Sequence, residues 1–215
     1  MEEILYLGID DTDTNKGGCT TYLASLLLEH ICKLGYKPYD YPLLVRLNPN
    51  IPYKTRGNAA VCLTFISEED LIEKVINFLD KLSYLFEEDK EKPQPVICFY
   101  KGVKNSKLYN FYIKCLTRHV TLNETINLAK NLNVKYYEIK KGLMGLIGAL
   151  AAIGADFKDE FTYELLAYRK LTEKNLKRYI QTEKVLEIEK KFNNLIFHNF
   201  DYKKKRILIT PHGKD

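Results

Sequence analysis

The sequence has no apolar run that approaches the roughly 18 residues of a membrane-spanning helix. Its N-terminus, MEEILYLGIDD, is acidic, which excludes a signal peptide and a transit peptide. The apolar stretch GLMGLIGALAAIG is too short to cross a bilayer, and it predicts a buried helix instead. We therefore expect a protein with no membrane partner.

Cysteines are few and scattered. The five cysteines stand at positions 19, 32, 62, 98 and 115, and no two of them form a C-x-x-C pair. This spacing argues against a zinc ribbon and against a disulfide framework. Free thiols are typical of a reducing compartment, so the sequence predicts a cytoplasmic protein.

Common nucleotide-binding and catalytic signatures are also absent. No G-K-[ST] follows a glycine-rich loop, which excludes a Walker A motif, and the absence of G-x-G-x-x-G weakens a Rossmann interpretation. The four histidines have neither the spacing of a catalytic triad nor that of a metal site. We find no internal repeat.

The composition is that of a folded globular protein. The 215 residues are 46% apolar and 28% charged, which excludes wholesale disorder and allows one large domain or two small ones. The net charge is +5, a weak indication of a polyanionic partner. Residues 1–50 nevertheless hold seven acids and four bases, a net of −3, so the other 165 residues carry +8.

Apolar periodicity predicts strands that alternate with helices. We expect strands over 4–9, 42–47, 59–66, 96–100, 109–116, 134–139, 162–168 and 206–210, and helices from about 22 to 34 and over 71–82, 123–132, 142–154 and 175–194. This alternation predicts an α/β or α+β fold. Residues 57–119 have the length and order of a small α+β module.

Three acids, Asp10, Asp11 and Asp13, lie between the first predicted strand and the first predicted helix. Open α/β folds bind phosphates and metals at such a position, and Mg²⁺ uses one or two carboxylates together with phosphate oxygens. An EF-hand is excluded, because the glycine comes one position late and Tyr22 replaces the final glutamate. The alternative is a solvated turn rich in aspartate.

The start of the first helix offers a second candidate site. Gly17 and Gly18 precede Cys19, Thr20 and Thr21, so backbone N–H groups can converge on an anion and two hydroxyls can contact a phosphate. The alternative is an ordinary helix N-cap.

Basic and amide side chains gather on one proline-containing loop, which suits contact with phosphates or a nucleic-acid backbone. They are Arg46, Asn48, Asn50, Lys54, Thr55, Arg56 and Asn58. The alternative is a solvated surface loop. A second basic group, Lys203 to Arg206, is open to the same two interpretations.

Four glycines follow Lys140 and Lys141, at 142, 145, 148 and 154. They allow either close approach of the backbone to a nucleotide or close packing of a helix on a sheet. Nearby Glu164 is a candidate metal ligand or a paired surface acid.

These features occur in order within distinctive strings: LGIDDTD, GGCTTYL, LVRLNPNIPYKTRGNAA, KGLMGLIGALAAIG, FTYELLAYR and ILITPHG. Together they resemble the archaeal tRNA-isoleucine 2-agmatinylcytidine synthetase family. The resemblance covers nearly the whole chain and is weakest between about 67 and 115.

The resemblance implies an ATP- and Mg²⁺-dependent ligase that modifies the wobble cytidine of an isoleucine tRNA. In that family the base is phosphorylated at carbon 2, and agmatine then displaces the phosphate. The implied fold is a kinase-like catalytic domain, here 1–56 and 120–215, with a ferredoxin-like α+β domain inserted at 57–119.

Residue roles follow from the same resemblance. Asp10, Asp11 and Asp13 match the metal-bearing catalytic acids, and Thr20 matches a threonine that contacts and can receive the terminal phosphate. The implied ATP-binding residues are Gly17, Gly18, Thr20, Thr21, Lys141, Gly142, Gly145 and Gly148. Those expected beside phosphates of the nucleotide or tRNA are Arg46, Asn48, Lys54, Arg56 and Asn58.

Family members are about twice as long and continue into an OB-fold and a zinc ribbon that hold the tRNA. We therefore expect half of a split enzyme with a second chain as partner, a fragment, or a paralogue. The paralogue would be a kinase for another substrate or a non-catalytic nucleotide- or RNA-binding module.

Overall fold

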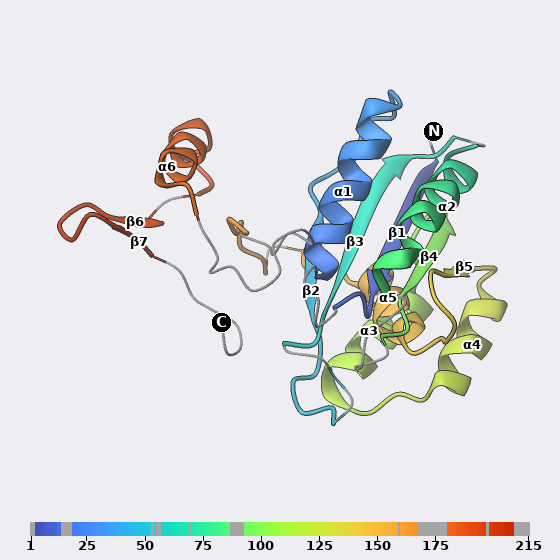
Figure 1. Cartoon of the computed structure of the whole chain (residues 1–215). Coiled ribbons are helices and arrows are strands. Elements are labelled where there is room, and N and C mark those ends of the chain that lie inside the picture. Colours follow the sequence, from blue (N-terminus) through green and yellow to red (C-terminus); the bar gives the residue numbers. More distant parts are fainter. Residues whose placement is uncertain are drawn as a thin grey trace.

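The computed structural model describes residues 3–13, 19–52, 54, 57–68, 70–86, 93–158, 160–166, 180–196 and 198–208. Its strands are β1 (Ile4–Asp10), β2 (Leu43–Arg46), β3 (Ala59–Ile66), β4 (Val96–Lys101), β5 (Lys135–Glu138), β6 (Phe200–Asp201) and β7 (Arg206–Ile207). Its helices are α1 (Thr20–Lys33), α2 (Leu71–Leu82), the short 3₁₀ helix η1 (Ser83–Phe86), α3 (Ser106–Thr117), α4 (Leu122–Asn131), α5 (Gly145–Gly154) and α6 (Thr182–Lys191) (Figure 1).

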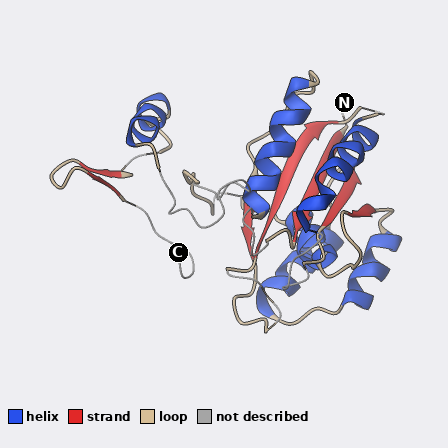
Figure 2. Ribbon diagram, in the orientation of Figure 1, coloured by secondary structure: helices blue, strands red, loops and turns tan. Residues whose placement is uncertain are grey.

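One five-stranded antiparallel sheet organises residues 4 to 138. Its strand order is β2-β3-β1-β4-β5, so β1 lies at the centre (Figure 2). The register places Gly8 opposite Cys62 on β3 and opposite Cys98 on β4. The fold is therefore of the α+β class, as the alternation of elements predicts.

The side chains of β1 divide the core into two layers. Leu5, Leu7 and Ile9 are fully buried on the face covered by α1 and α2. Residues of opposite parity face α5, which α3 and α4 cover in turn (Figure 1). This two-sided burial follows from the period-2 alternation of side chains along a strand.

Helix α5 packs unusually close to the sheet. An ideal Cβ at Gly8 would overlap the carbonyl oxygen of Ala149, and one at Gly154 would overlap that of Leu108. Almost every residue of α5 is buried, because the sheet covers one side and α3 and α4 cover the other. The alternative of close helix packing therefore accounts for Gly154 and for the apolar character of this segment.

Local signals end and begin several helices. Gly35 follows α1 with φ of 94°, the left-handed conformation typical of a helix C-terminus. Asn105 caps α3 by accepting the N–H groups of Lys107 and Leu108, and Thr121 caps α4 by accepting that of Glu124. Each cap satisfies donors that the first helical turn leaves unpaired.

The expected strand over 109–116 is wrong, because this segment lies within helix α3. Its aromatic and branched residues resemble a strand locally. The buried residues Leu108, Phe111, Tyr112 and Cys115 recur at helical spacing, and this face packs against α5. Packing partners decided between two interpretations of one short apolar segment.

The C-terminal expectations were met in part. The expected strand over 162–168 is absent from its described part, 162–166. Within the expected helix over 175–194, α6 covers Thr182–Lys191, and 175–179 lie outside the described residues. Of the last predicted strand, β7 forms Arg206–Ile207 and pairs with β6, whereas 209 and 210 lie outside the described residues.

The expected division at 56/57 and 119/120 does not coincide with a division of the sheet. Strands β3 and β4, both within 57–119, pair on either side of β1. A strand pattern does not reveal its pairing partner, so the local strand–helix–strand order of 57–119 suggested a module of its own.

In the described part of the chain, no helix is long and apolar enough to span a membrane.

Candidate active site at one end of the sheet

Three regions singled out in the sequence meet at one end of the sheet. The register places Asp10, the last residue of β1, opposite Val96, which in turn lies opposite Glu138 at the end of β5. On the other side, Arg46 at the end of β2 lies opposite Ala59. The strands are antiparallel, so three segments lie at this same end of the sheet. They are the acid loop that follows β1, the basic loop between β2 and β3, and the glycine-rich turn that leads from β5 into α5.

Asp10 points toward α5. Its carboxylate lies against Gly148, where an ideal Cβ would overlap Oδ2. Burial raises the pKa of Asp10 well above its usual range; a bond from the Asp11 N–H opposes this, and the charges of Asp11 and Asp13 add to it. A nearby cation would stabilise the charged form of a carboxylate in this position.

Asp11 has a left-handed backbone, with φ of 57°. Its Oδ2 accepts the backbone N–H of Gln94 at 2.8 Å. Burial raises the pKa of Asp11; the Gln94 bond lowers it, and the charge of Asp13 raises it. The acid loop thus holds its carboxylates under mutual repulsion.

The donor set suits a partial metal site rather than a closed one. In the part of the chain that the structure describes, no three His, Cys, Asp or Glu side chains are grouped so that they could hold a metal ion. Asp10 faces α5, whereas Asp11 accepts from Gln94. This arrangement fits Mg²⁺, which takes one or two protein carboxylates and completes its shell with water and phosphate oxygens.

Helix α1 begins beside the acid loop, at Thr20. Thr12 Oγ1 donates to Thr20 Oγ1 at 3.1 Å, and the two residues are only 2% and 8% exposed. Cys19 occupies the N-cap position without a capping side-chain bond, and its Sγ lies 3.1 Å from Thr21 Oγ1. The first turn contains no acid, so the positive end of the helix suits an anion. The predicted Gly17 and Gly18 lie outside the described residues.

The amides of the basic loop shape the loop itself. Asn58 has φ of 47°, its Nδ2 donates to the carbonyl of Asn48, and its carbonyl accepts the N–H of Leu47. Asn48 Oδ1 accepts the N–H of Asn50. Arg46 and Lys54 are exposed and each has a partner. The predicted Arg56 lies outside the described residues, as does Thr55.

The glycine-rich turn separates into buried and accessible positions. Gly145 and Gly148 are buried, and an ideal Cβ at Gly145 would lie 2.7 Å from the carbonyl of Gln94. Lys141 is exposed, and Gly142, with φ of 124°, donates its N–H to Glu138 Oε2 at 3.0 Å. A nucleotide bound at this end of the sheet would therefore contact Lys141 and Gly142 more readily than the buried Gly145 or Gly148.

Gln94 is the site residue that the sequence did not reveal. It bonds to Asp11 on one side and to the start of α5 on the other. Its only sequence signal is its position between two prolines in a charged stretch, a pattern that suggests a linker.

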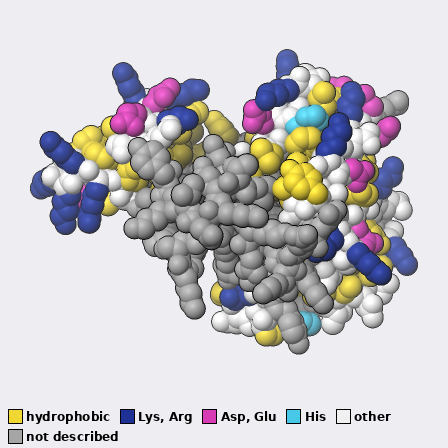
Figure 3. Space-filling model, in the orientation of Figure 1, with side chains coloured by type: hydrophobic (Ala, Val, Ile, Leu, Met, Phe, Trp, Pro, Cys, Tyr) yellow, Lys and Arg dark blue, Asp and Glu magenta, His cyan; other side chains and the backbone are white. Residues whose placement is uncertain are grey.

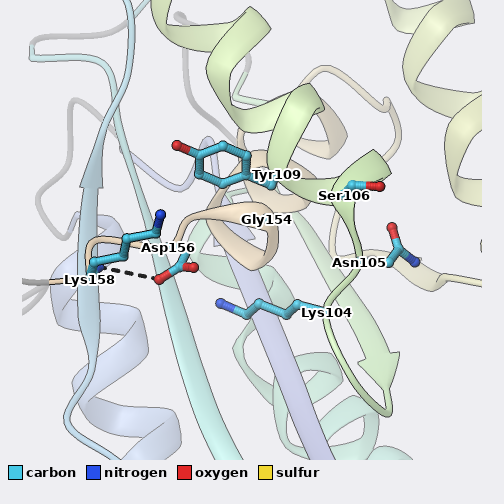
Figure 4. A pocket seen from close by; sticks show the side chains of 7 residues that line it. All are labelled: Lys104, Asn105, Ser106, Tyr109, Gly154, Asp156 and Lys158. Atoms are coloured by element: carbon cyan, nitrogen blue, oxygen red, sulfur yellow. Dashed lines mark hydrogen bonds between the residues drawn. The ribbon is translucent and has the colours of Figure 1, made fainter.

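Other candidates lie apart from this edge. Glu164 is exposed, and its neighbour Tyr163 packs edge-on against Tyr41 at 5.6 Å between ring centroids. Figure 3 shows Lys and Arg side chains gathered near the β6–β7 hairpin, where Lys203, Lys204 and Lys205 are exposed. A cavity of about 260 Å³ lies at the opposite end of α5, between Gly154, Lys104 and Asp156 (Figure 4).

Two family models match the chain. The TiaS TCKD domain matches residues 6–69, and the TiaS FLD domain matches residues 144–215.

Curated relatives match over nearly all of the chain. It is 45% identical over 213 residues to the isoleucine-tRNA 2-agmatinylcytidine synthetase TiaS of Pyrococcus horikoshii, covering 99% of this chain and 50% of that protein. It is 42% identical to the protein of the same name in Thermococcus sibiricus, covering 98% of this chain and 49% of the relative. The chain thus spans about half the length of the curated relatives it matches.

Solved structures agree with these matches. One match is the TiaS chain in the crystal structure of its complex with an isoleucine tRNA and ATP. The two chains are 32% identical with a TM-score of 0.70, and the match covers 97% of this chain and 49% of that TiaS chain. A TiaS complex with an isoleucine tRNA, AMPCPP and agmatine is 30% identical with a TM-score of 0.73, and covers 97% of this chain and 50% of its own.

Proposed function

The chain belongs to the TiaS family, and from that premise we propose that it carries the ATP-dependent step of 2-agmatinylcytidine synthesis on an isoleucine tRNA. The substrates would be ATP, the wobble cytidine and agmatine. The cytidine carbonyl oxygen at carbon 2 is a poor leaving group until it is phosphorylated. Agmatine's primary amine then attacks carbon 2, and phosphate leaves.

One observation supports this proposal above all. Carboxylates, a helix N-terminus without a capping side chain and a hydroxyl held by a hydrogen bond all lie at one end of the sheet. Phosphoryl transfer depends mainly on positioning and on charge around the transferred group. The acid loop, the start of α1 and the Thr12–Thr20 bond supply these elements. Arg46 at the end of β2 adds a positive charge at the same edge.

We assign Mg²⁺ to the acid loop. Asp10, Asp11 and Asp13 are its candidate ligands, and one or two of them would hold it together with nucleotide phosphate oxygens; when bound it would neutralise charge on the transferred phosphate. The raised pKa values of Asp10 and Asp11 support this assignment, since burial and, to a smaller extent, neighbouring carboxylates raise them, and a bound cation would stabilise the charged forms against both.

Thr20 is assigned the contact with the terminal phosphate. Its Oγ1 accepts the proton of Thr12, so its own hydroxyl proton remains to be donated. Lys141 and Gly142 would lie at the nucleotide's edge, and Arg46, Lys54 and Arg56 would contact phosphates of ATP or tRNA.

The decisive experiment follows label from γ-labelled ATP in the presence and absence of isoleucine tRNA and agmatine. Nucleosides from the tRNA are analysed by mass spectrometry for agmatinylcytidine. A parallel reaction adds, as a separate chain, the half of the Pyrococcus horikoshii relative that this chain does not match, which tests the predicted need for a tRNA-binding partner.

Each outcome has a defined meaning. Label on the tRNA and formation of agmatinylcytidine support the proposal, and a Thr20→Ala variant should reduce both. Label that moves only to other acceptors would indicate a kinase for another substrate. If no label moves under any condition, the remaining interpretation is a non-catalytic module that binds nucleotide or RNA.

A further inference from the structure

Gln94 joins two parts of the candidate site that are far apart in sequence. Its backbone N–H donates to Asp11 Oδ2 at 2.8 Å. Its side-chain Oε1 accepts the N–H of Met144 at 3.1 Å, and its carbonyl accepts the N–H of Gly145 at 3.2 Å. Three of its polar groups are thus used to connect the acid loop with the first residues of α5.

The prolines on either side explain how one residue can hold this position. Pro93 and Pro95 are buried, whereas Gln94 between them is partly exposed. A proline has no N–H and disfavours helical conformation in the residue before it. The Gln94 N–H is therefore the only backbone donor of this tripeptide, and it is directed at Asp11.

The glycine-rich turn is adapted to this side chain. An ideal Cβ at Gly142 would lie 2.5 Å from the Gln94 side chain, so the turn leaves space for it. The carbonyl of Pro95 also accepts the N–H of Ile139, which ties the end of β5 to the same segment. Acid loop, β5 and the start of α5 are all bonded to residues 94 and 95.

We propose that Gln94 is a positioning residue that sets the relation between Asp11 and the turn carrying Lys141 and Gly142. It acts through Asp11 and Met144, and it is not assigned a contact with nucleotide. The inference rests on the proposed function, because the arrangement it maintains is the proposed Mg²⁺–nucleotide site. Its side chain fixes the turn, whereas its backbone orients the carboxylate.

The test compares three substitutions in the full chain. Gln94→Met keeps the length and the backbone bonds but removes the acceptor for Met144. Gln94→Glu keeps an oxygen acceptor at the same distance. Gln181→Ala, at an exposed position whose side chain makes no capping bond to α6, is the matched control.

Two quantities are measured for each protein: hydrogen exchange of the Met144 amide by NMR, and affinity for Mg²⁺·AMPCPP by calorimetry. We expect Gln94→Met to accelerate Met144 exchange and to weaken nucleotide binding about three- to tenfold, the effect of one lost hydrogen bond. Gln94→Glu should restore slow exchange. Gln181→Ala should change neither.

The outcomes separate this inference from the proposed function. Wild-type binding that Gln94→Met leaves unchanged, despite faster Met144 exchange, makes Gln94 a purely structural residue and overturns the inference alone. No nucleotide binding by the wild-type chain would overturn the proposed function and this role with it. Shorter Gln94→Asn provides a second variant should Gln94→Met fail to fold.

Discussion

The carboxylate of Asp10 packs directly against the backbone of Gly148, so closely that no side chain at 148 can be accommodated without moving it. Asp10 ends the central strand, and Gly148 lies one turn into α5. The glycine therefore belongs to the acid loop in space, although 138 positions separate the two residues in sequence.

Gly148→Ala should displace the Asp10 carboxylate. We expect the free energy of unfolding to fall by about 1–3 kcal/mol, the usual range for overpacking, and Mg²⁺·ATP binding to be lost. Urea unfolding and calorimetric titration measure the two effects.

Gly35→Ala is the matched control for that variant. Gly35 lies beyond the other end of α1 with φ of 94°, and no atom lies within 4 Å of an ideal Cβ there. Its strained backbone should cost about 1–2 kcal/mol and leave nucleotide binding intact. Equal loss of binding in both variants would show that general destabilisation, not Asp10, is responsible.

Asp11→Asn separates the charge of this residue from its geometry. Asparagine tolerates the left-handed backbone and can still accept the Gln94 N–H. Without metal, its unfolding free energy should rise because a largely desolvated charge is removed and repulsion from Asp13 is lost, while Mg²⁺·ATP affinity should fall about tenfold, or ~1.4 kcal/mol. Thermal melts with and without Mg²⁺·ATP report both changes.

Asp11→Ala, the companion variant, removes the Gln94 bond as well as the charge. It should be less stable than Asp11→Asn by about 1–3 kcal/mol. If the two variants are equally stable, the Asp11–Gln94 bond contributes nothing to the fold.

The acid loop should make metal-free stability fall as pH rises. The folded-state pKa values of Asp10 and Asp11 are raised, so the folded chain binds protons more tightly than the unfolded chain. Their contribution is complete below the ordinary carboxyl pKa of about 4 and is lost as pH rises through the folded values.

The double variant Asp10→Asn/Asp11→Asn provides the reference for this measurement. The variant should be more stable than the wild type, and this difference in unfolding free energy should grow with pH above about 4 and then level off. Mg²⁺ should make the difference smaller. Urea unfolding between pH 4 and 8 gives the curve. A difference that does not vary with pH would contradict the raised pKa values.

Thr12→Val removes the hydroxyl that donates to Thr20 and keeps the shape of the side chain. The unfolding free energy should fall by about 1 kcal/mol. Label transfer should fall further than ATP affinity, since the Thr20 hydroxyl loses its fixed orientation. Thr125→Val is the control, because Thr125 is also fully buried and its Oγ1 donates to the carbonyl of Thr121, away from the site.

The buried thiols should resist alkylation in the folded protein. Burial raises the pKa of Cys62 to about 11 and that of Cys115 to about 12, and it also raises the pKa of Cys98. Cys32 is exposed. Iodoacetamide at pH 8 followed by peptide mass spectrometry should modify Cys32 at least tenfold faster than these three, whereas comparable rates would indicate frequent opening of the core between the sheet, α3 and α5.

The sequence by itself determined much of the local structure. Short apolar segments predicted β1, β3 and β4, and helical spacing predicted α1, α2 and α4. The acid loop was recognised because carboxylates between a strand and a helix form a local pattern. The family strings were likewise readable from order alone, and the matches to TiaS proteins agree with them.

Only the tertiary structure decided which segments meet. Periodicity states which face of an element is apolar but not which partner covers it, so α3 was mistaken for a strand and the pairing of β3 and β4 with β1 was not foreseen. For the same reason no pattern linked Gln94 to Asp11, or Gly148 to Asp10. These contacts join residues more than 80 positions apart, and they arise from the register of the sheet and the close approach of α5.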